Sequence, residues 1–177
     1  IVCYPMLGAQ KDLVADIALY GFKFVGIAVL RFMMCGTNSR EILKMLDLPE
    51  LSADYELVEW DNKYFDDAVE IVQEGFENSA DALFDPRFKS IEGTKDIVTK
   101  IVENIYVEFL PEATSIILHN GQPVGFCFMN LTGGSIANIP IVSIKKDFQG
   151  KGLSKYMLKK SVEKLLMWAD NGEKPIV

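Results

Sequence analysis

The sequence predicts an α/β (α+β) fold, in which β-strands and amphipathic α-helices follow one another along the chain. Three observations predict it. Apolar residues recur at helical spacing in two segments, which begin near Asp61 and Thr94. The turn 120–122 separates two apolar segments, as in a β-hairpin. An apolar strand that ends at Ile144 continues through a glycine-containing turn into a long amphipathic helix beginning at Leu153.

The length and composition are those of an ordinary soluble globular protein. A chain of 177 residues, 49% hydrophobic and 24% charged, has room for one domain, or one domain and a fragment. The formal net charge is −7, and no block of Lys and Arg interleaves with aromatic residues. We therefore expect no nucleic-acid binding, and the acidic surface mildly favours cationic acceptors such as amines.

Cysteine and histidine are too few and too scattered for a metal site or a disulfide framework. Cys3, Cys35 and Cys127 are odd in number and far apart, which favours a reducing cytoplasm. His119 is the only histidine, stands beside the predicted turn and is expected to be a solvated surface residue. With no second His and no paired Cys, the sequence predicts no metal and no Ser/His/Asp triad.

The apolar run 17–30 is not expected to span a membrane, because Lys23 interrupts it and Gly21 and Gly26 divide it. A helix end followed by a strand is expected instead. The chain starts without Met and stops within what looks like a new strand, at 174–177. We therefore expect an excerpt of a longer protein.

From Tyr55 the elements follow in a regular order. Residues 55–60 alternate as a strand does, and Asp61 is placed to cap the first helix. Residues 78–93 contain Pro, Asp, Ser and Gly and are expected to form a loop. The second helix starts near Thr94 and must end before Pro111. The residues expected on the buried sides of these two helices are Tyr64, Phe65, Ala68, Ile71, Val72 and Phe76, then Ile97, Ile101, Ile105, Tyr106 and Phe109.

The second half of the chain is expected to form three strands and a helix. Strands 113–119 and 123–131 flank the hairpin turn, and residues 132–134 make the next turn. Strand 135–144 leads into the glycine-containing turn. The last helix runs from Leu153 to about Asp170 and ends at Asn171-Gly172. Its apolar face comprises Leu153, Met157, Leu158, Val162, Leu165, Leu166 and Ala169.

The turn before the last helix has the chemistry of a phosphate cradle. A strand, a tight turn and a first helical turn direct several backbone N–H groups, and the positive end of the helix dipole, to one point. It is not a Walker loop, since Lys151 is followed by Gly152. It is not a dinucleotide fingerprint either, because Lys155 stands at the sixth position.

The sequence Gln149-Gly150-Lys151-Gly152-Leu153-Ser154 resembles the acyl-CoA pyrophosphate loop of the GNAT (GCN5-related) N-acetyltransferases, with the pattern Gln/Arg-x-x-Gly-x-Gly/Ala. Ser154 takes the last small position. The hairpin 120–126 and the order of the elements over residues 55–177 are similar to that family too. The resemblance implies an acyl-CoA N-acyltransferase-like fold, with a mixed, mostly antiparallel sheet flanked by helices.

The resemblance also implies a reaction, in which acetyl-CoA donates its acetyl group to a primary amine of an unidentified acceptor, without a metal. The pantetheine arm would pair with the backbone of 142–144. The pyrophosphate would bind the N–H groups of 149–154, with Lys151 and Lys155 available for charge-assisted contacts. The implied cofactor-binding residues are Val142, Ser143, Ile144, Gln149, Gly150, Lys151, Gly152, Leu153 and Ser154.

No catalytic residue is assigned. The family often uses a carboxylate on its central strands, and residues 136–144 contain none. Asn138 and Ser143 could at most position a water. Glu108 and Glu112 are the nearest acids in sequence and are expected to be solvated residues at a helix end. The family's acid, often a tyrosine, would lie in a C-terminal part that the chain lacks.

Residues 1–36 are expected to form a strand (1–6), a helix (9–20) and a second strand (27–34), a pattern that resembles this C-terminal part, including Gly21-Phe22 after the helix. Residues 37–54 are expected to be a linker with one short helical piece, 40–46. A tandem protein is one explanation, in which the tail of one GNAT-like domain precedes most of a second. Docking of the segment onto the C-terminal strand in permuted order, or an unrelated β-α-β element, are the others.

Two alternatives to the enzyme stay open. A non-catalytic acyl-CoA-binding module is favoured by the absence of a carboxylate on strand 135–144. A structural half of a tandem enzyme that binds no CoA is disfavoured by Gly150, Gly152 and Ser154, because a purely structural turn does not need all three small residues.

Overall fold

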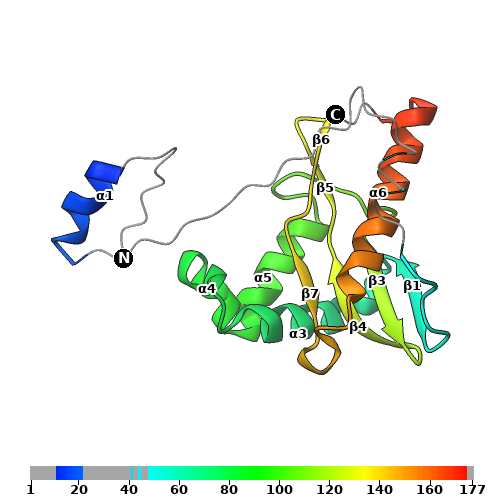
Figure 1. The fold of residues 1–177 in the computed structure, drawn as a ribbon, viewed down its shortest axis with the longest axis horizontal. Helices are drawn as coiled ribbons and strands as arrows, with labels where there is room; N and C mark the ends of the chain where they lie inside the picture. The colour runs from blue at the N-terminus through cyan, green and yellow to red at the C-terminus, as the bar shows by residue number, and fades with distance from the viewer. Residues whose placement is uncertain (1–10, 22–40, 42–43, 45–47, 175–177) are drawn as a thin grey trace. The chain divides into compact units, whose positions relative to one another are not determined.

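The computed structural model describes residues 11–21, 41, 44 and 48–174, which belong to two units, Ile1–Phe32 and Met33–Val177 (Figure 1). In the first unit the described element is α1 (Lys11–Ala18), within the helix predicted for 9–20. The strands predicted for 1–6 and 27–34 lie outside the described residues, as does most of 40–46 and of 174–177. The second unit carries the rest of the description.

Alternating apolar residues of the second unit form an antiparallel sheet in the order β1-β3-β4-β7. Asn120 (φ 49°) and Gly121 (φ 78°) make the two-residue turn between β3 and β4, with the positive φ angles that a tight hairpin requires. The predicted hairpin is confirmed. The bounds of the strands are β1 (Tyr55–Glu59), β3 (Ser115–His119), β4 (Gln122–Cys127) and β7 (Val142–Ile144).

A second antiparallel sheet has the order β2-β5-β6 and comprises β2 (Glu108–Phe109), β5 (Asn130–Thr132) and β6 (Ile136–Asn138). The predictions of continuous strands over 123–131 and 135–144 are therefore wrong. Each segment is divided between the two sheets. Pro140 has no N–H to give to a ladder, and the N–H of Phe128 donates to the carbonyl of Ile141 at 3.0 Å across the division.

Three longer helices cover the two faces of the strands. Helices α3 (Phe65–Phe76) and α5 (Ile91–Val102) pack in one core with strand residues such as Ile116 and Phe126. Helix α6 (Leu153–Asn171) packs in a second core with the strand residues next in sequence to these, such as Ile117 and Cys127. Because successive strand residues point to opposite faces, α6 lies across the sheet from α3 and α5 (Figure 1).

The segment between α3 and α5 is not the predicted loop. It contains α4 (Asp81–Phe84) and the 3₁₀ turn η2 (Pro86–Lys89), and α5 begins at Ile91 rather than near Thr94. Its polar residues are helix caps: Asp85 accepts from the N–H of Arg87, and Ser90 accepts from the N–H of Gly93, each at 3.1 Å. Asp61 likewise accepts from the N–H of Lys63 at 3.0 Å, but caps the 3₁₀ turn η1 (Asn62–Tyr64) that precedes α3.

Helix α5 ends at Val102, earlier than the apolar spacing predicted. Asn104 adopts a positive φ of 59°, and its side-chain oxygen accepts from the N–H of Phe109 at 2.5 Å. The chain turns at this point, so Ile105 and Tyr106 are 60% and 55% exposed and not on a buried helix face. Phe109 is buried as predicted, but from β2.

Candidate functional site

The predicted phosphate loop, residues 149–154, leads from the 3₁₀ turn η3 (Lys146–Phe148) into the first turn of α6. Gly150 and Gly152 both have a φ of +74°, a conformation that residues with side chains rarely adopt. A Cβ on either glycine would meet nothing within 4 Å. The two glycines are therefore required by the backbone conformation, and the space beside them is open to a ligand.

The loop presents a row of unused hydrogen-bond donors. Among the described residues, the backbone N–H groups of Gly150, Lys151, Gly152, Leu153 and Ser154 have no acceptor, and no side chain caps α6. These groups lie at the positive end of the dipole of a 19-residue helix. Such an arrangement binds phosphate-type anions.

Gln149 does not have the role predicted for it, because its backbone N–H is already hydrogen-bonded. Its N–H donates to the carbonyl of Lys146 at 3.2 Å, so it does not join the row of unused donors. Its side-chain Nε2 donates to the carbonyl of Ile144 at 2.8 Å and ties the loop to the end of β7. The side chain of Leu153 anchors the other end of the loop, because it is buried in the core beneath α6.

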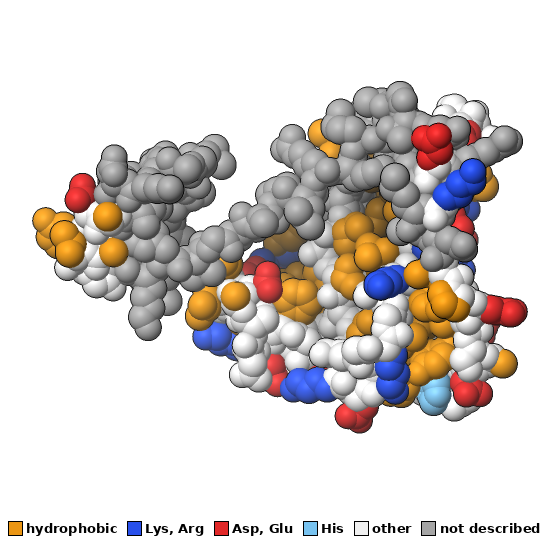
Figure 2. Space-filling model, viewed as in Figure 1, with side chains coloured by type: hydrophobic (Ala, Val, Ile, Leu, Met, Phe, Trp, Pro, Cys, Tyr) orange, Lys and Arg blue, Asp and Glu red, His pale blue; other side chains and the backbone are white. Residues whose placement is uncertain are grey.

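An aromatic cluster supports the loop. The ammonium of Lys151 lies 4.7 Å from the ring centroid of Phe148, which contacts His119 at 5.0 Å and Tyr55 at 6.5 Å between centroids. His119 is half-buried, and its ring lies tilted against that of Tyr55 with 4.8 Å between the centroids (pale blue in Figure 2, beside hydrophobic side chains). The prediction of a solvated surface histidine is therefore wrong, because Tyr55 and Phe148 approach it only in the folded chain.

Strand β7 offers its backbone but not its serine hydroxyl. On one side it pairs with β4, and on its other side no described strand pairs with it. The backbone groups of Val142 and Ile144 face that edge and can accept an extended ligand, whereas those of Ser143 face Phe126 in β4. The Ser143 side chain is buried and donates to the carbonyl of Ile71 in α3 at 2.8 Å, so it cannot also position a water at that edge.

The two acidic residues considered as bases are both ion-paired. Glu108 contacts Lys174 at 2.6 Å, and Glu112 contacts Lys164 at 3.2 Å. Glu108 lies in β2, and not at a helix end as predicted, because α5 stops at Val102. These ion pairs hold Glu112 to Lys164 in α6 and Glu108 to Lys174 after α6, and neither pair brings a carboxylate to the edge of β7.

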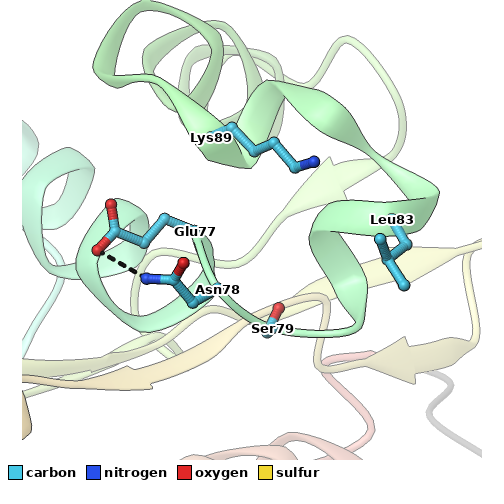
Figure 3. Close-up of a pocket in the computed structure, with 5 residues that line it drawn as sticks. All are labelled: Glu77, Asn78, Ser79, Leu83 and Lys89. Atoms are coloured by element: carbon cyan, nitrogen blue, oxygen red, sulfur yellow. Dashed lines mark hydrogen bonds between the residues drawn. The ribbon is translucent and has the colours of Figure 1, made fainter.

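A pocket of about 450 Å³ opens between the C-terminal end of α3 and η2 (Figure 3). Glu77 accepts from Asn78 at 3.2 Å on one side, and Lys89 lies across from them. Glu77 also forms an ion pair of 3.6 Å with Lys146, which follows β7. The lining residues are Glu77, Asn78, Ser79, Leu83 and Lys89.

A second cavity, of about 520 Å³, lies on the α6 side, between residues 48–51, β1 and α6. Over the described ranges, no three His, Cys, Asp or Glu side chains gather as metal ligands would. The same residues include no helix with the length and apolar character needed to cross a membrane.

No family model matches the chain, and no curated protein matches its sequence. Solved structures do match it. A candidate acetyltransferase from Pyrococcus horikoshii is 15% identical, with a TM-score of 0.51, over 66% of this chain and 36% of that one. PH1933 from Pyrococcus horikoshii OT3 is 14% identical, with a TM-score of 0.50, over 64% of this chain and 73% of that one.

PaiA N-acetyltransferase from Thermoplasma acidophilum, solved in complex with coenzyme A, is 13% identical, with a TM-score of 0.46, over 67% and 74% of the two chains. The chain thus spans between about a third and three quarters of the length of these three structures. Its antiparallel sheets flanked by helices have the fold of the GCN5-related N-acetyltransferases, as the sequence predicted, and all strand pairings among the described residues are antiparallel.

Proposed function

We propose that this chain binds acetyl-CoA and transfers its acetyl group to a primary amine. The row of unused N–H groups from Gly150 to Ser154 carries the proposal. On this fold, a diphosphate is the ligand class whose size and charge match several converging donors at a helix N-terminus. Lys151, held over Phe148, adds a positive charge beside the loop.

The direction of β7 then sets the position of the reacting group. With the pyrophosphate on the loop, the pantetheine arm would run back along the open edge of Ile144, Ser143 and Val142. It would bring the thioester towards the division between β6 and β7, at 139–141. In the reaction, the amine nitrogen forms a bond to the thioester carbonyl carbon and the carbon–sulfur bond breaks. The amine loses one proton and the departing sulfur gains one.

A non-catalytic acyl-CoA-binding module is the second candidate. The ion-paired state of Glu108 and Glu112, and the absence of any carboxylate from residues 136–144, favour it. Both candidates use the same loop for binding. They differ in whether CoA is released when an amine is added to the chain and acetyl-CoA.

Calorimetric titration with acetyl-CoA tests the binding. We expect the 177-residue chain to bind and Gly152→Glu not to bind, because the substitution brings bulk and negative charge to the pyrophosphate position. Gly172→Glu is the matched control: Gly172 ends the same helix with a φ of +69° and the same open space around a Cβ. It should cost similar stability and leave affinity unchanged. Equal affinity in Gly152→Glu and the parent would remove the loop from the proposal.

Detection of free thiol then separates the two candidates. Acetyl-CoA is mixed with the chain and a panel of primary amines, and the released CoA is measured against a sample with Gly152→Glu. Release that requires the intact loop supports the transferase. Binding without release by any amine supports the non-catalytic module.

Two further parts of the proposal concern the surroundings of the chain. Residues 1–36 resemble the C-terminal part of a second domain of this fold, which would be the partner within a longer parent chain. The cytoplasm is the proposed location, and the free, buried Cys127 is compatible with a reducing compartment. The number of acetyl-CoA sites per parent chain would test the tandem arrangement.

A further inference from the structure

Asn130, in the smaller sheet, has a buried side chain with an unpaired polar atom. The residue is 7% exposed, and its Oδ1 has no hydrogen-bond donor among the described residues. Rotating the carboxamide by half a turn would leave a buried NH₂ group in the same position. Buried polar groups in folded proteins are nearly always paired, so this one is suited to a ligand.

Asn130 stands at the point where the two sheets divide. It is the first residue of β5, and its direct cross-strand partner is Asn138, the last residue of β6. Directly beyond Asn138, residues 139–141 separate β6 from β7. This is the point to which the pantetheine arm of the proposed donor would lead along β7. The two asparagines therefore lie next to the proposed thioester position.

Both asparagines share the face of the sheet that is opposite α6. Asn130 also pairs directly with Phe109 in β2, and directly paired residues point to the same face. Phe109 belongs to the core formed with α3 and α5, whereas Leu131, the next residue after Asn130, belongs to the core formed with α6. An acceptor on this face would approach the thioester from the side away from the helix that holds the pyrophosphate.

The side-chain NH₂ of Asn138 is hydrogen-bonded, whereas its side-chain oxygen accepts from no described donor. Its Nδ2 donates to Thr132 Oγ1 at 2.7 Å and to the carbonyl of Ile136 at 3.0 Å. No described residue donates to its Oδ1 in return. Cβ atoms of directly opposed residues are about 5 Å apart in an antiparallel pair. Two carboxamide oxygens that accept from no described donor thus belong to directly opposed residues on one face.

We infer that Asn130 and Asn138 bind the nitrogen of the primary-amine acceptor. The inference rests on the proposed function. A primary amine has at least two N–H groups and can satisfy both oxygens, whereas a hydroxyl could satisfy only one. The oxygens carry no net charge, so they would favour the protonated form of the amine less than a carboxylate would. This matters because only the unprotonated nitrogen can attack.

The test uses n-butylamine as the probe and the side-chain amide NMR signals of the 177-residue chain. Butylamine is titrated with and without CoA. We expect saturable shifts of the Asn130 and Asn138 NH₂ signals. Two variants are compared: Asn130→Leu, which has a similar shape and no polar atom, and Thr94→Val. Thr94 is the matched control, because its Oγ1 is also buried and without a partner, but in α5.

Both variants should melt at or above the temperature of the parent, since each removes an unpaired buried polar atom. Asn130→Leu should bind butylamine at least tenfold more weakly, read from the Asn138 signal, and Thr94→Val should bind it as the parent does. The inference is overturned by unshifted asparagine signals in the parent, by parental affinity in Asn130→Leu, or by a lower melting temperature of that variant alone.

The outcomes also separate this inference from the proposed function. Acetyl-CoA binding by calorimetry together with unmoved asparagine signals would overturn the amine site and leave the acyl-CoA site. Absence of acetyl-CoA binding together with saturable shifts would overturn the acyl-CoA site and leave the amine site.

Discussion

Gly75 of α3 and Ser143 of β7 lie so close that no side chain fits between them. A Cβ added to Gly75 would overlap Ser143 Oγ and would stand 3.5 Å from Ser143 Cβ. The same hydroxyl donates to the carbonyl of Ile71, one turn earlier in α3. The helix is thereby held directly against the strand whose open edge is the proposed acyl-CoA site.

We expect Gly75→Ala to destabilise the fold by about 1–3 kcal/mol, because it overfills this contact. The change would normally stabilise a helix, since Gly costs about 0.5–1 kcal/mol relative to Ala. Urea unfolding measures the effect. In a Ser143→Ala background the hydroxyl is absent, and Gly75→Ala should become neutral or stabilising. Additive effects of the two substitutions would contradict the described contact.

Gly93 in α5 has a similar constraint, here against the backbone of η2. A Cβ at this position would overlap the carbonyl oxygen of Arg87 and lie 2.7 Å from its Cα. We expect Gly93→Ala to cost about 1–3 kcal/mol in urea unfolding, since a backbone cannot move aside as a side chain can. Lys95→Ala, an exposed position in the same helix, is the control and should change stability by less than about 0.5 kcal/mol. A gain in stability for Gly93→Ala would show that α5 does not pack on η2 in this way.

Gln149→Ala should loosen the phosphate loop without unfolding the chain. The substitution removes the 2.8 Å hydrogen bond to the carbonyl of Ile144. We expect acetyl-CoA affinity to fall roughly fivefold, the equivalent of about 1 kcal/mol for one hydrogen bond. Calorimetry measures the affinity and thermal unfolding the stability. Asn171→Ala removes an exposed amide at the far end of α6 and should alter neither. An unchanged affinity in Gln149→Ala would mean that the brace does not shape the loop.

Cys127 should make stability depend on pH in alkaline solution. Burial raises the pKa of its thiol from the ordinary 9.0 to about 11, although hydrogen bonds from Ser161 and Ser115 act in the opposite direction. Between these two pKa values the Cys127 thiol stays protonated in the folded chain but ionises in the unfolded chain. The stabilisation is complete below pH 9 and is lost as the pH rises towards 11.

The comparison with Cys127→Ser isolates this effect, because serine does not ionise in that range. Between about pH 9 and pH 11 the parent should lose roughly 2–3 kcal/mol relative to the variant, at 1.36 kcal/mol per unit of pKa shift. Urea unfolding at several pH values measures the difference. Parallel stability curves for the two proteins would show that the thiol is accessible to solvent.

The parts of the fold that depend on local chemistry could be predicted from the sequence. Asn120 and Gly121 suit the positive φ angles of a tight hairpin, and Gly150 and Gly152 suit those of the phosphate loop. These signals depend on a few neighbouring residues and on no distant contact. The same holds for α6, whose apolar spacing and terminal Gly172 are both present in the sequence.

The remaining features depend on contacts between distant segments. The division of 135–144 between two sheets coincides with a change of register, because Phe128 bonds to Ile141 in the register of β4 and β7, whereas Asn130 pairs with Asn138 one residue out of that register. The alternation of apolar residues does not indicate this change. Asn104 ended α5 early through a bond to Phe109, although the helical spacing continued to Ile105.

The site residues show the same limit. Asn130 lies near the end of the predicted strand 123–131, and nothing in that apolar segment indicated that its side-chain oxygen would be buried without a partner. Gln149 was part of the motif, but its bond to Ile144 depends on the shape of the turn. A glutamine followed by Gly-x-Gly after an apolar strand is the one local signal that could have indicated this brace.

The open edge of β7 also affects the behaviour of the chain in solution. Beyond β4, β7 pairs with no strand in the part of the chain that the structure describes, and such an edge is a template for any extended segment, including one from a second copy of the same chain. The backbone groups assigned to pantetheine are therefore also groups through which copies would aggregate. Acyl-CoA on this edge would compete with aggregation, so we expect the loaded chain to stay dispersed at concentrations at which the empty chain precipitates.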